Sequence, residues 1–130
     1  MLSDPISDLL CRLRNAARAQ HTEVLLPHSR LKFNIAEVLK QEGYLTDVAV
    51  EGNTPRKTIR MKLRFSGRKS VIEGLRRMSS PGRRVYAGSD EIPKIRGGLG
   101  VVVLSTSAGV LTDREARRRK LGGELLCCVW

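Results

Sequence analysis

Three consecutive hydroxyl side chains, Ser105-Thr106-Ser107, lie a few residues before a run of cations. Short hydroxyls and loop amides can lie flat against a nucleotide, where longer side chains would obstruct it. The segment Thr112-Asp113-Arg114-Glu115 then fits a helix capping box, and the start of a helix favours phosphate through its amides and dipole. The cations of this region are Arg114, Arg117, Arg118, Arg119 and Lys120. A polar turn would also explain the hydroxyls, but the helix start and the cations favour a nucleic-acid contact.

Other residues could contact RNA or be ordinary surface, and the sequence leaves both interpretations open. Tyr86 could stack on an unpaired base, although a single tyrosine in a strand more often lies in the core or at its rim. One expected strand alternates Ile59, Met61, Leu63 and Phe65 with Arg60, Lys62 and Arg64. Its cationic face could bind phosphate. It could equally well be a solvated face or belong to a guarded edge strand. The polar side of the first helix, with Arg12, Asn15 and Arg18, could face RNA but is better explained as solvated surface.

The sequence contains no arrangement of residues typical of catalysis or of cofactor binding. The stretch Gly97-Gly98-Leu99-Gly100 suggests a dinucleotide-binding motif, but Val103 takes the place of its last glycine and a strand is expected to follow. His21 and His28 have no ligand cluster beside them, so no metal site is expected. Neither histidine is placed near the hydroxyls, and the lone carboxylates are explained by helix capping. We therefore expect that the protein is not an enzyme and that it binds neither a cofactor nor a small-molecule substrate.

The three cysteines, Cys11, Cys127 and Cys128, form neither a C-x-x-C pair nor an even disulfide framework. We expect them to be reduced, structural thiols. In a strand, Cys127 and Cys128 would point to opposite faces, so at most one of them is expected in a core.

Net charge distinguishes this chain of 130 residues: 24 Lys and Arg against 13 Asp and Glu leave +11. Residues 1–65 contain 11 basic and 7 acidic side chains, and residues 66–130 contain 13 and 6. An excess spread over both halves predicts a polyanionic partner. The longest apolar run is far shorter than the roughly 20 residues of a membrane span, and Asp4 and Asp8 lie where a signal peptide would carry cations. The expected location is the cytosol, with no membrane partner.

Five elements are expected in the first half of the chain. Asp4 can cap a helix that runs to about Arg18, with apolar residues at helical spacing. A short strand at 23–26 precedes a second helix, which is capped by Ser29 and ended by Gly43. Alternating apolar residues predict strands at 45–50 and 59–65, joined by a turn at 52–55. Polar residues around Gly67 mark the expected boundary between two subdomains.

The second half is expected to be mostly β structure. A strand at 71–78 and its hairpin partner at 83–87 flank a type II turn at Ser80-Pro81-Gly82. A buried strand at 100–104, a polar loop at 105–109, a short helix through Lys120 that stops at Gly122, and a last strand at 124–130 follow. The fold class is therefore α+β with two small subdomains. Residues 1–66 form an N-terminal α-β-α-β-β unit, and residues 67–130 form a C-terminal, mostly antiparallel β unit with one short helix.

Several longer motifs occur along the chain. The most specific are Ser105-Thr106-Ser107, Gly109-Val110-Leu111-Thr112-Asp113-Arg114-Glu115-Ala116-Arg117 and Gly122-Gly123-Glu124. The others are Ser3-Asp4-Pro5-Ile6, Arg12-Leu13-Arg14-Asn15-Ala16, Glu42-Gly43-Tyr44, Ser80-Pro81-Gly82-Arg83-Arg84-Val85-Tyr86 and Val129-Trp130. In this order they resemble the bacterial small-subunit ribosomal protein eight family, and the resemblance covers essentially the whole chain.

The resemblance implies a non-enzymatic protein that binds the central domain of small-subunit ribosomal RNA and helps to organise the platform of a cytoplasmic or organellar ribosome. The RNA contacts it implies in the C-terminal half are Ser105, Thr106 and Ser107, with Tyr86, Gly122, Gly123 and Glu124 nearby. We add Arg114, Arg117 and Arg118 as phosphate contacts. In the N-terminal half we expect Ser29, Arg30 and Lys32 to contact the backbone of the RNA. The resemblance also implies contacts with neighbouring ribosomal proteins. In bacteria it further implies repression of the protein's own operon through a messenger RNA that mimics the ribosomal site.

Four positions depart from the family pattern. Ala108 replaces a frequent lysine and so removes a cation beside the hydroxyls, whereas Ser70, Leu121 and Cys128 look like packing changes. Two alternatives to the ribosomal function are a free regulatory RNA or DNA binder and a small hydrolase or nuclease. The full-length resemblance disfavours the first, and the missing catalytic constellation disfavours the second.

Overall fold

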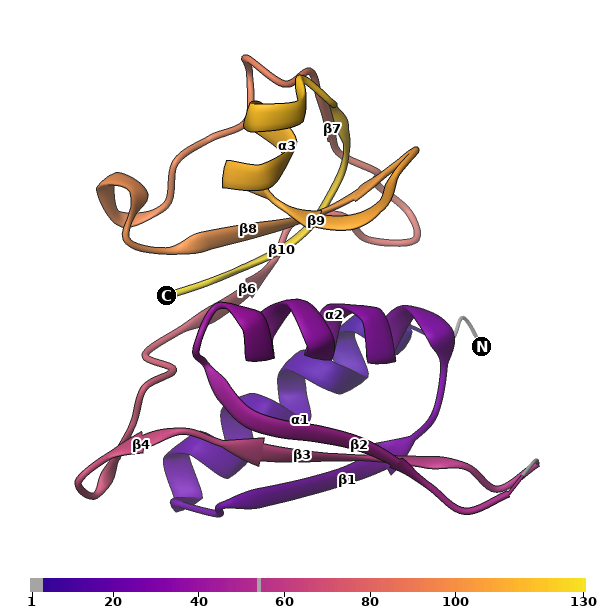
Figure 1. The fold of residues 1–130 in the computed structure, drawn as a ribbon, viewed down its shortest axis with the longest axis vertical. Helices are drawn as coiled ribbons and strands as arrows, with labels where there is room; N and C mark the ends of the chain where they lie inside the picture. The colour runs from indigo at the N-terminus through magenta and orange to yellow at the C-terminus, as the bar shows by residue number, and fades with distance from the viewer. Residues whose placement is uncertain (1–3, 54) are drawn as a thin grey trace. The chain divides into compact units, whose positions relative to one another are not determined.

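The structure, a computed structural model, describes residues 4–53 and 55–130 and divides them into two compact units (Figure 1). The first unit is Pro5–Glu73. The second is Gly74–Trp130 together with Asp4. Each unit combines helix with antiparallel sheet, which confirms the expected α+β class. Thr54, in the expected turn at 52–55, and Ser3 of the first family motif lie outside the described residues.

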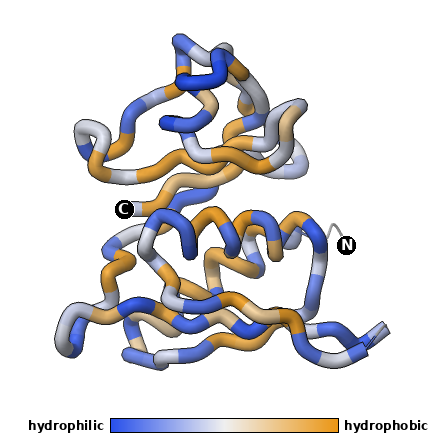
Figure 2. The backbone as a smooth tube through the Cα atoms, in the orientation of Figure 1, coloured by the Kyte–Doolittle hydropathy of each residue, from blue (hydrophilic) through white to orange (hydrophobic). Residues whose placement is uncertain are grey.

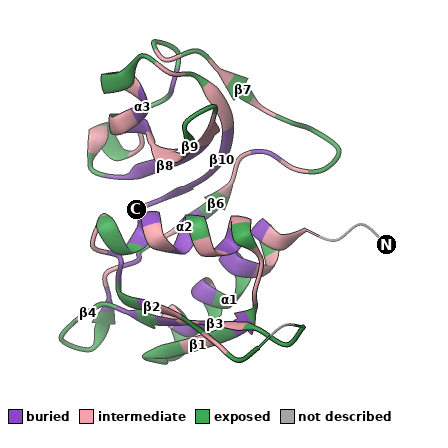
Figure 3. Ribbon diagram, turned by 45° about the vertical axis from the view of Figure 1, so that its right-hand side comes forward, coloured by how far each residue is buried: buried purple, intermediate pink, exposed green. Residues whose placement is uncertain are grey.

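The first unit is a three-stranded antiparallel sheet with two helices on one face (Figures 1 and 3). Its elements are α1 (Pro5–Ala19), β1 (Glu23–Pro27), α2 (Arg30–Gln41), β2 (Leu45–Glu51), β3 (Thr58–Leu63), β4 (Phe65–Ser66) and β5 (Lys69–Ser70). The strand order is β1-β3-β2, and β4 and β5 form a separate two-stranded hairpin. The predicted helices and the three sheet strands are confirmed within a few residues of their expected ends.

The two helices form because each carries a stripe of apolar residues that the sheet can cover. Hydrophobic and hydrophilic residues are interleaved along both helices and along the strands beneath them (Figure 2). The stripe of α1 buries Ile6, Leu9, Leu10, Leu13 and Ala16. At the start of α2, the Ser29 hydroxyl accepts a hydrogen bond from the Lys32 amide at 3.1 Å, as a helix cap requires.

The cations of β3 belong to a face of the sheet that carries its own carboxylates. Arg60 lies opposite Leu25 of β1 and Ala49 of β2, and its guanidinium forms ion pairs with Glu23 and Glu51. The guarded-edge interpretation is wrong, because β3 lies between β1 and β2, and Arg60 is paired with carboxylates of both neighbouring strands. The strand is also shorter than expected: it ends at Leu63, and the following residues begin the β4–β5 hairpin.

The second unit is a five-stranded antiparallel sheet with one short helix. Its elements are β6 (Leu75–Arg77), β7 (Tyr86–Ala87), η1 (Arg96–Gly98, a 3-10 turn), β8 (Val101–Thr106), β9 (Gly109–Thr112), α3 (Asp113–Arg119) and β10 (Gly123–Val129). The strand order is β6-β10-β8-β9, and β7 also pairs with β10. The core of the unit consists of Ile92, Val102, Leu104, Ala116, Leu125 and Cys128.

The predicted hairpin at 71–87 is wrong in its pairing. β6 and β7 do not pair with each other: β6 pairs with β10 at residues 127–129, and β7 pairs with β10 at residues 123–124. The two short strands thus share β10 as their partner, because Ser79 and the turn after it separate them. The turn itself is closed by hydrogen bonds between Ser80 and Arg83, but φ of Gly82 is not positive, so it is not the predicted type II turn.

The strand predicted at 71–78 is reduced to β6. Just before β6, an added Cβ on Gly74 would lie 2.3 Å from the ring of Trp130. The backbone therefore runs directly against the last side chain of the chain, and Gly74 and Trp130 exchange two backbone hydrogen bonds of 3.0 Å.

The predicted polar loop at 105–109 is also wrong. Ser105 and Thr106 are the last residues of β8, only Ser107 and Ala108 form the turn, and Gly109 already begins β9. The left-handed conformation of Gly109, with φ of +104°, permits this short connection.

Cys127 and Cys128 are both fully buried, which corrects the expectation that at most one of them lies in a core. Adjacent residues of a strand point to opposite faces, but residues 125–129 of β10 are buried throughout, so neither face of this strand meets solvent. Burial raises the pKa of the Cys127 thiol to about 12 and also raises the pKa of Cys128. Both thiols are free, as is the exposed Cys11.

Candidate nucleic-acid interface

Three predicted contact residues lie in one row across the second sheet. Tyr86 of β7 is directly opposite Glu124 of β10, and Glu124 is directly opposite Ser105 of β8. Residues opposite each other in antiparallel strands project from the same face of a sheet. Tyr86 is 69% exposed, and Arg84 Nη1 lies 3.0 Å from the Glu124 carboxylate. We call Tyr86, Glu124 and Ser105 the sheet row.

The two glycines before Glu124 are required by the close approach of three strands. A Cβ on Gly123 would lie 2.1 Å from the carbonyl oxygen of Ser105, and one on Gly122 would lie 2.5 Å from that of Ala87. Any larger residue would push β10 away from its neighbours. Gly122 and Gly123 therefore permit the close approach of β7, β8 and β10 on which the sheet row depends.

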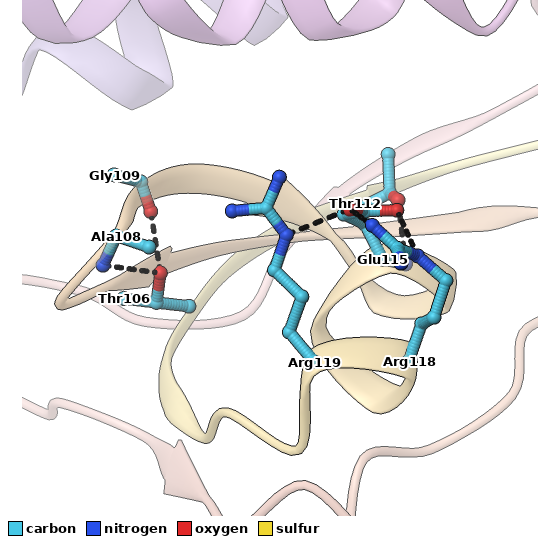
Figure 4. A network of polar contacts seen from close by, with 7 residues as sticks. All are labelled: Thr106, Ala108, Gly109, Thr112, Glu115, Arg118 and Arg119. Atoms are coloured by element: carbon cyan, nitrogen blue, oxygen red, sulfur yellow. Dashed lines mark hydrogen bonds and ion pairs between the residues drawn. The ribbon is translucent and has the colours of Figure 1, made fainter.

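The three hydroxyls of the Ser105-Thr106-Ser107 motif are not equivalent. Thr106 Oγ1 donates to the carbonyl of Gly109 at 2.8 Å and accepts from the amide of Ala108 at 3.1 Å (Figure 4). Its only donor is therefore used inside the hairpin. Within the described residues, the hydroxyls of Ser105 and Ser107 have no hydrogen-bond partner, and Ser107 is exposed. These two remain available to a ligand.

The first turn of α3 is occupied by the chain's own side chains. The Thr112 hydroxyl accepts from the Glu115 amide at 3.1 Å, which confirms the predicted N-cap. The Glu115 carboxylate binds Arg118 and, at 2.7 Å, Arg119 (Figure 4). These hydrogen bonds lower the pKa of Glu115 to about 2. Glu115 thus stays ionised and neutralises part of the cationic run.

Arg117, one of the predicted phosphate contacts, is a structural side chain in this fold. Its guanidinium pairs with Asp113 at 2.9 Å and donates to the carbonyls of Ile92 and Pro93 at 3.1 Å. Asp113 is itself 5% exposed and accepts a hydrogen bond from the Val102 amide. Arg117 therefore ties α3 to the loop before β8.

Arg114 differs from the other arginines of α3. It is exposed, and no carboxylate or hydrogen-bond acceptor pairs with its side chain in the part of the chain that the structure describes. Lys120, which ends the helix in the left-handed conformation with φ of +59°, is exposed and unpaired among the same residues. Of the cationic run, these two side chains are the ones free to meet phosphate.

The predicted contacts of the first unit also include residues that are occupied within the fold and one that is not. Ser29 caps α2, and the Lys32 ammonium lies 3.5 Å from Asp8 with its side chain only 8% exposed. Arg30 is exposed and lacks an ion-pair partner among the described residues. The structure adds two cations that the sequence analysis missed: the His28 amide donates to the carbonyl of Lys57 at 3.0 Å, which brings Arg56 and Lys57 close to the start of α2. The sequence feature that could have identified them is a pair of adjacent basic residues in a turn that contains no carboxylate.

Among the described residues there is no group of three or more His, Cys, Asp or Glu side chains that could hold a metal ion. No helix in the same part of the chain is long and apolar enough to cross a membrane.

Comparison with known proteins gives one family. The model of the family "Ribosomal protein S8" matches residues 4–130. The protein named small ribosomal subunit protein uS8 of Nitratidesulfovibrio vulgaris is 55% identical over 130 residues, which is the full length of both chains. The protein of the same name from Rubrobacter xylanophilus is 52% identical and covers 99% of this chain and 98% of its own. The chain therefore belongs to the ribosomal protein S8 family, whose members are structural constituents of the small ribosomal subunit, and it is not an enzyme.

Proposed function

We propose that this protein binds the central domain of small-subunit ribosomal RNA directly, with the sheet row and Ser107 as the surface that reads the RNA. The observation that carries the proposal is the position of Tyr86 beside Glu124 and Ser105 on one face of the sheet, with the Tyr86 ring 69% exposed. An exposed aromatic ring beside free hydroxyls suits splayed bases better than a regular duplex.

The parts of this surface have different tasks. Tyr86 stacks on an unpaired base, an interaction worth about 1–3 kcal/mol per base in other RNA-binding proteins. Ser105 and Ser107 offer hydroxyls that both donate and accept, so they can bond base edges or a ribose 2′-hydroxyl. The Glu124 carboxylate holds Arg84 at 3.0 Å, which keeps a guanidinium at the edge of the row.

Phosphate contacts come from cations that the fold leaves unpaired. In the second unit these include Arg114 and Lys120, and in the first unit Arg30, Arg56 and Lys57, none of which has an ion-pair partner among the described residues. Such contacts position a protein on RNA without reading sequence. Arg117, Arg118, Arg119 and Lys32 are ion-paired within the chain and contribute mainly through the net charge of +11.

Two further partners follow from the same proposal. A component of the small subunit lies among other ribosomal proteins, so we expect contacts with its neighbours there. A messenger RNA from its own operon that presents the same splayed bases would compete for the sheet row, which would repress translation of that operon.

The test is titration of the purified protein with a central-domain stem at several salt concentrations, without other ribosomal proteins. Each phosphate neutralised steepens the slope of log affinity against log salt by roughly 0.9 in duplex RNA or DNA. We expect a steep slope and preference for the cognate stem over a scrambled one. A flat salt response would overturn a phosphate-dominated interface, and equal affinity for both stems would overturn specific reading. Sedimentation of the tagged protein in lysate adds a second criterion, because a slowly sedimenting free pool would favour a regulatory binder instead.

A further inference from the structure

The second unit contains an open groove of about 470 Å³ that the proposed RNA surface does not use. Its lining residues are Arg76, Arg77, Met78, Arg83 and Val85. Met78 and Val85 are half-buried and pack against the core of the unit, so they form an apolar floor. Arg76 and Arg83 are exposed. The groove thus combines apolar surface with guanidinium groups.

The walls of the groove are fixed by hydrogen bonds. Ser79 is fully buried, and its hydroxyl accepts from the Val85 amide at 2.9 Å and donates to the Val85 carbonyl at 3.2 Å. The turn beside it is closed by two backbone bonds between Ser80 and Arg83, of 2.9 and 3.0 Å. A ligand therefore meets a preformed surface and does not have to order a loop, which favours binding.

The charges in the groove are only partly neutralised. Arg77 pairs with Asp4 and donates to the carbonyl of Ser79. No carboxylate pairs with Arg76 or Arg83 anywhere in residues 4–53 and 55–130. The Arg76 side chain lies beside the buried Cys128 thiol, where its charge partly offsets the rise in pKa that burial causes. Two guanidinium groups without counter-charge therefore flank the floor.

We propose that this groove holds one unpaired nucleotide of the bound RNA, with Arg83 and Arg76 on its phosphate and Met78 and Val85 beneath its base. Guanidinium groups bind phosphate oxygens in pairs and also stack on base planes. A simple anion would leave the apolar floor uncovered, and an apolar ligand would leave the charges unused. The inference rests on the proposed RNA binding, and it assigns that RNA a second contact, separate from the sheet row.

The experiment is a titration of the full chain with adenosine monophosphate, followed by the methyl NMR signals of Met78 and Val85. We expect these methyls to shift through the ring current of the base. The exposed methyls of Leu25 and Val50, which are 53% and 40% exposed in the first unit, serve as internal controls and should not move. Adenosine without phosphate and inorganic phosphate without base should each bind more weakly than the nucleotide.

A pair of matched variants tests the role of charge. Arg83→Gln should weaken binding of the nucleotide by at least about tenfold, the loss of one charge-assisted hydrogen bond. Arg68→Gln removes a cation of the first unit that is also exposed and has no ion-pair partner among the described residues, and it should leave the affinity unchanged. Because both side chains are exposed, neither change should unfold the protein. Unchanged affinity in Arg83→Gln would overturn the proposal.

Other outcomes separate the groove from the proposed function. Shifts at Tyr86 without shifts at Met78 and Val85 would place the nucleotide in the sheet row and overturn the groove alone. Phosphate that binds as tightly as the nucleotide would overturn the contact with the base. If the methyls respond as expected but the protein fails to prefer the central-domain stem, the groove remains a nucleotide site and the proposed function fails.

Discussion

The hydroxyl of Thr106 is bonded to the opposite strand of its own hairpin, donating to the carbonyl of Gly109 at 2.8 Å. The same oxygen accepts from the Ala108 amide. Thr106 therefore shapes the turn, whereas its neighbours Ser105 and Ser107 keep free hydroxyls. Within one motif of three similar residues, one hydroxyl is used to build the turn, and the other two have no hydrogen-bond partner among the described residues.

This separation predicts opposite effects of two neighbouring changes. Thr106→Val keeps the shape of the side chain but removes both hydrogen bonds, so it should lower the free energy of unfolding by about 1–2 kcal/mol. Ser107→Ala should leave stability unchanged and should cost about 1–3 kcal/mol of affinity for the cognate stem. Denaturant unfolding and RNA titration of both variants provide the measurements.

The salt slope provides the control for this pair. Because Ser107 is uncharged, Ser107→Ala should leave the dependence of affinity on salt nearly intact. If it weakened cognate and scrambled stems equally, or changed the salt slope, Ser107 would not be a reading residue.

Arg114 and Arg117 lie three residues apart in one short helix but should behave differently. Arg114→Gln removes a free cation, so it should weaken binding to all stems and lower the salt slope by roughly one unit, with no loss of stability. Arg117→Gln leaves Asp113 buried without its partner, so it should destabilise the fold by about 1–3 kcal/mol. Equal stability losses in both variants would contradict the ion-pair assignment.

Gly123→Ala should destabilise the second unit. The added Cβ would lie 2.1 Å from the carbonyl oxygen of Ser105, and neither strand can move without breaking the sheet row. We expect a loss of about 1–3 kcal/mol in the free energy of unfolding. Gly82→Ala is the matched control, because nothing lies within 4 Å of its added Cβ and its φ is not positive. A stable Gly123→Ala protein would show that β10 is less tightly enclosed than described.

Glu115 should titrate far below an ordinary glutamate. Its pKa is lowered from 4.5 to about 2 by hydrogen bonds from Arg118 and Arg119, so its contribution to stability is present above about pH 4.5 and is lost as the pH falls towards 2. NMR titration of its carboxyl carbon gives the midpoint. Replacing both arginines by glutamine should return that midpoint towards 4.5, and an unchanged midpoint would refute their role.

The cysteines should differ in both reactivity and pH dependence. Cys11 is exposed and should react with an alkylating reagent in the folded protein, whereas Cys127, whose pKa is about 12, should not. Above about pH 9 the unfolded state loses the Cys127 proton that the folded state keeps, so stability should fall as the pH rises. Cys127→Ala should reduce this fall, measured by unfolding at about pH 8 and about pH 11. Rapid alkylation of Cys127 in the native protein would contradict its burial.

Replacing all three cysteines by alanine provides a further check. We expect RNA affinity to persist apart from effects of lower stability, because no cysteine lies in the sheet row. A larger loss would mean that a thiol takes part in binding.

Local sequence patterns determined the helices of this protein and the strands of its first sheet. The helical spacing of apolar residues predicted α1 and α2, and Ser29 and Thr112 cap their helices as expected. Such features depend on contacts within a few residues, so they can be recognised in the chain itself. The family motifs likewise identified the hydroxyls, Tyr86 and the glycine pair as candidate contacts.

Tertiary structure decided how these elements meet and which candidates remain free. The pairing of β7 with β10 places Tyr86 next to Glu124, 38 positions along the chain. Cys127 and Cys128 are buried where β10 runs between β6 and β8. Ion pairs with Asp8 and Asp113 occupy Lys32 and Arg117, although all the arginines and lysines look alike in the sequence. Lys32 and Asp8 lie on different helices, and Arg117, although only four positions from Asp113, also donates to the carbonyls of Ile92 and Pro93, more than 20 positions away. Contacts between distant residues form only in the folded chain, and this is why the sequence predicted the cations but not which of them stay unpaired.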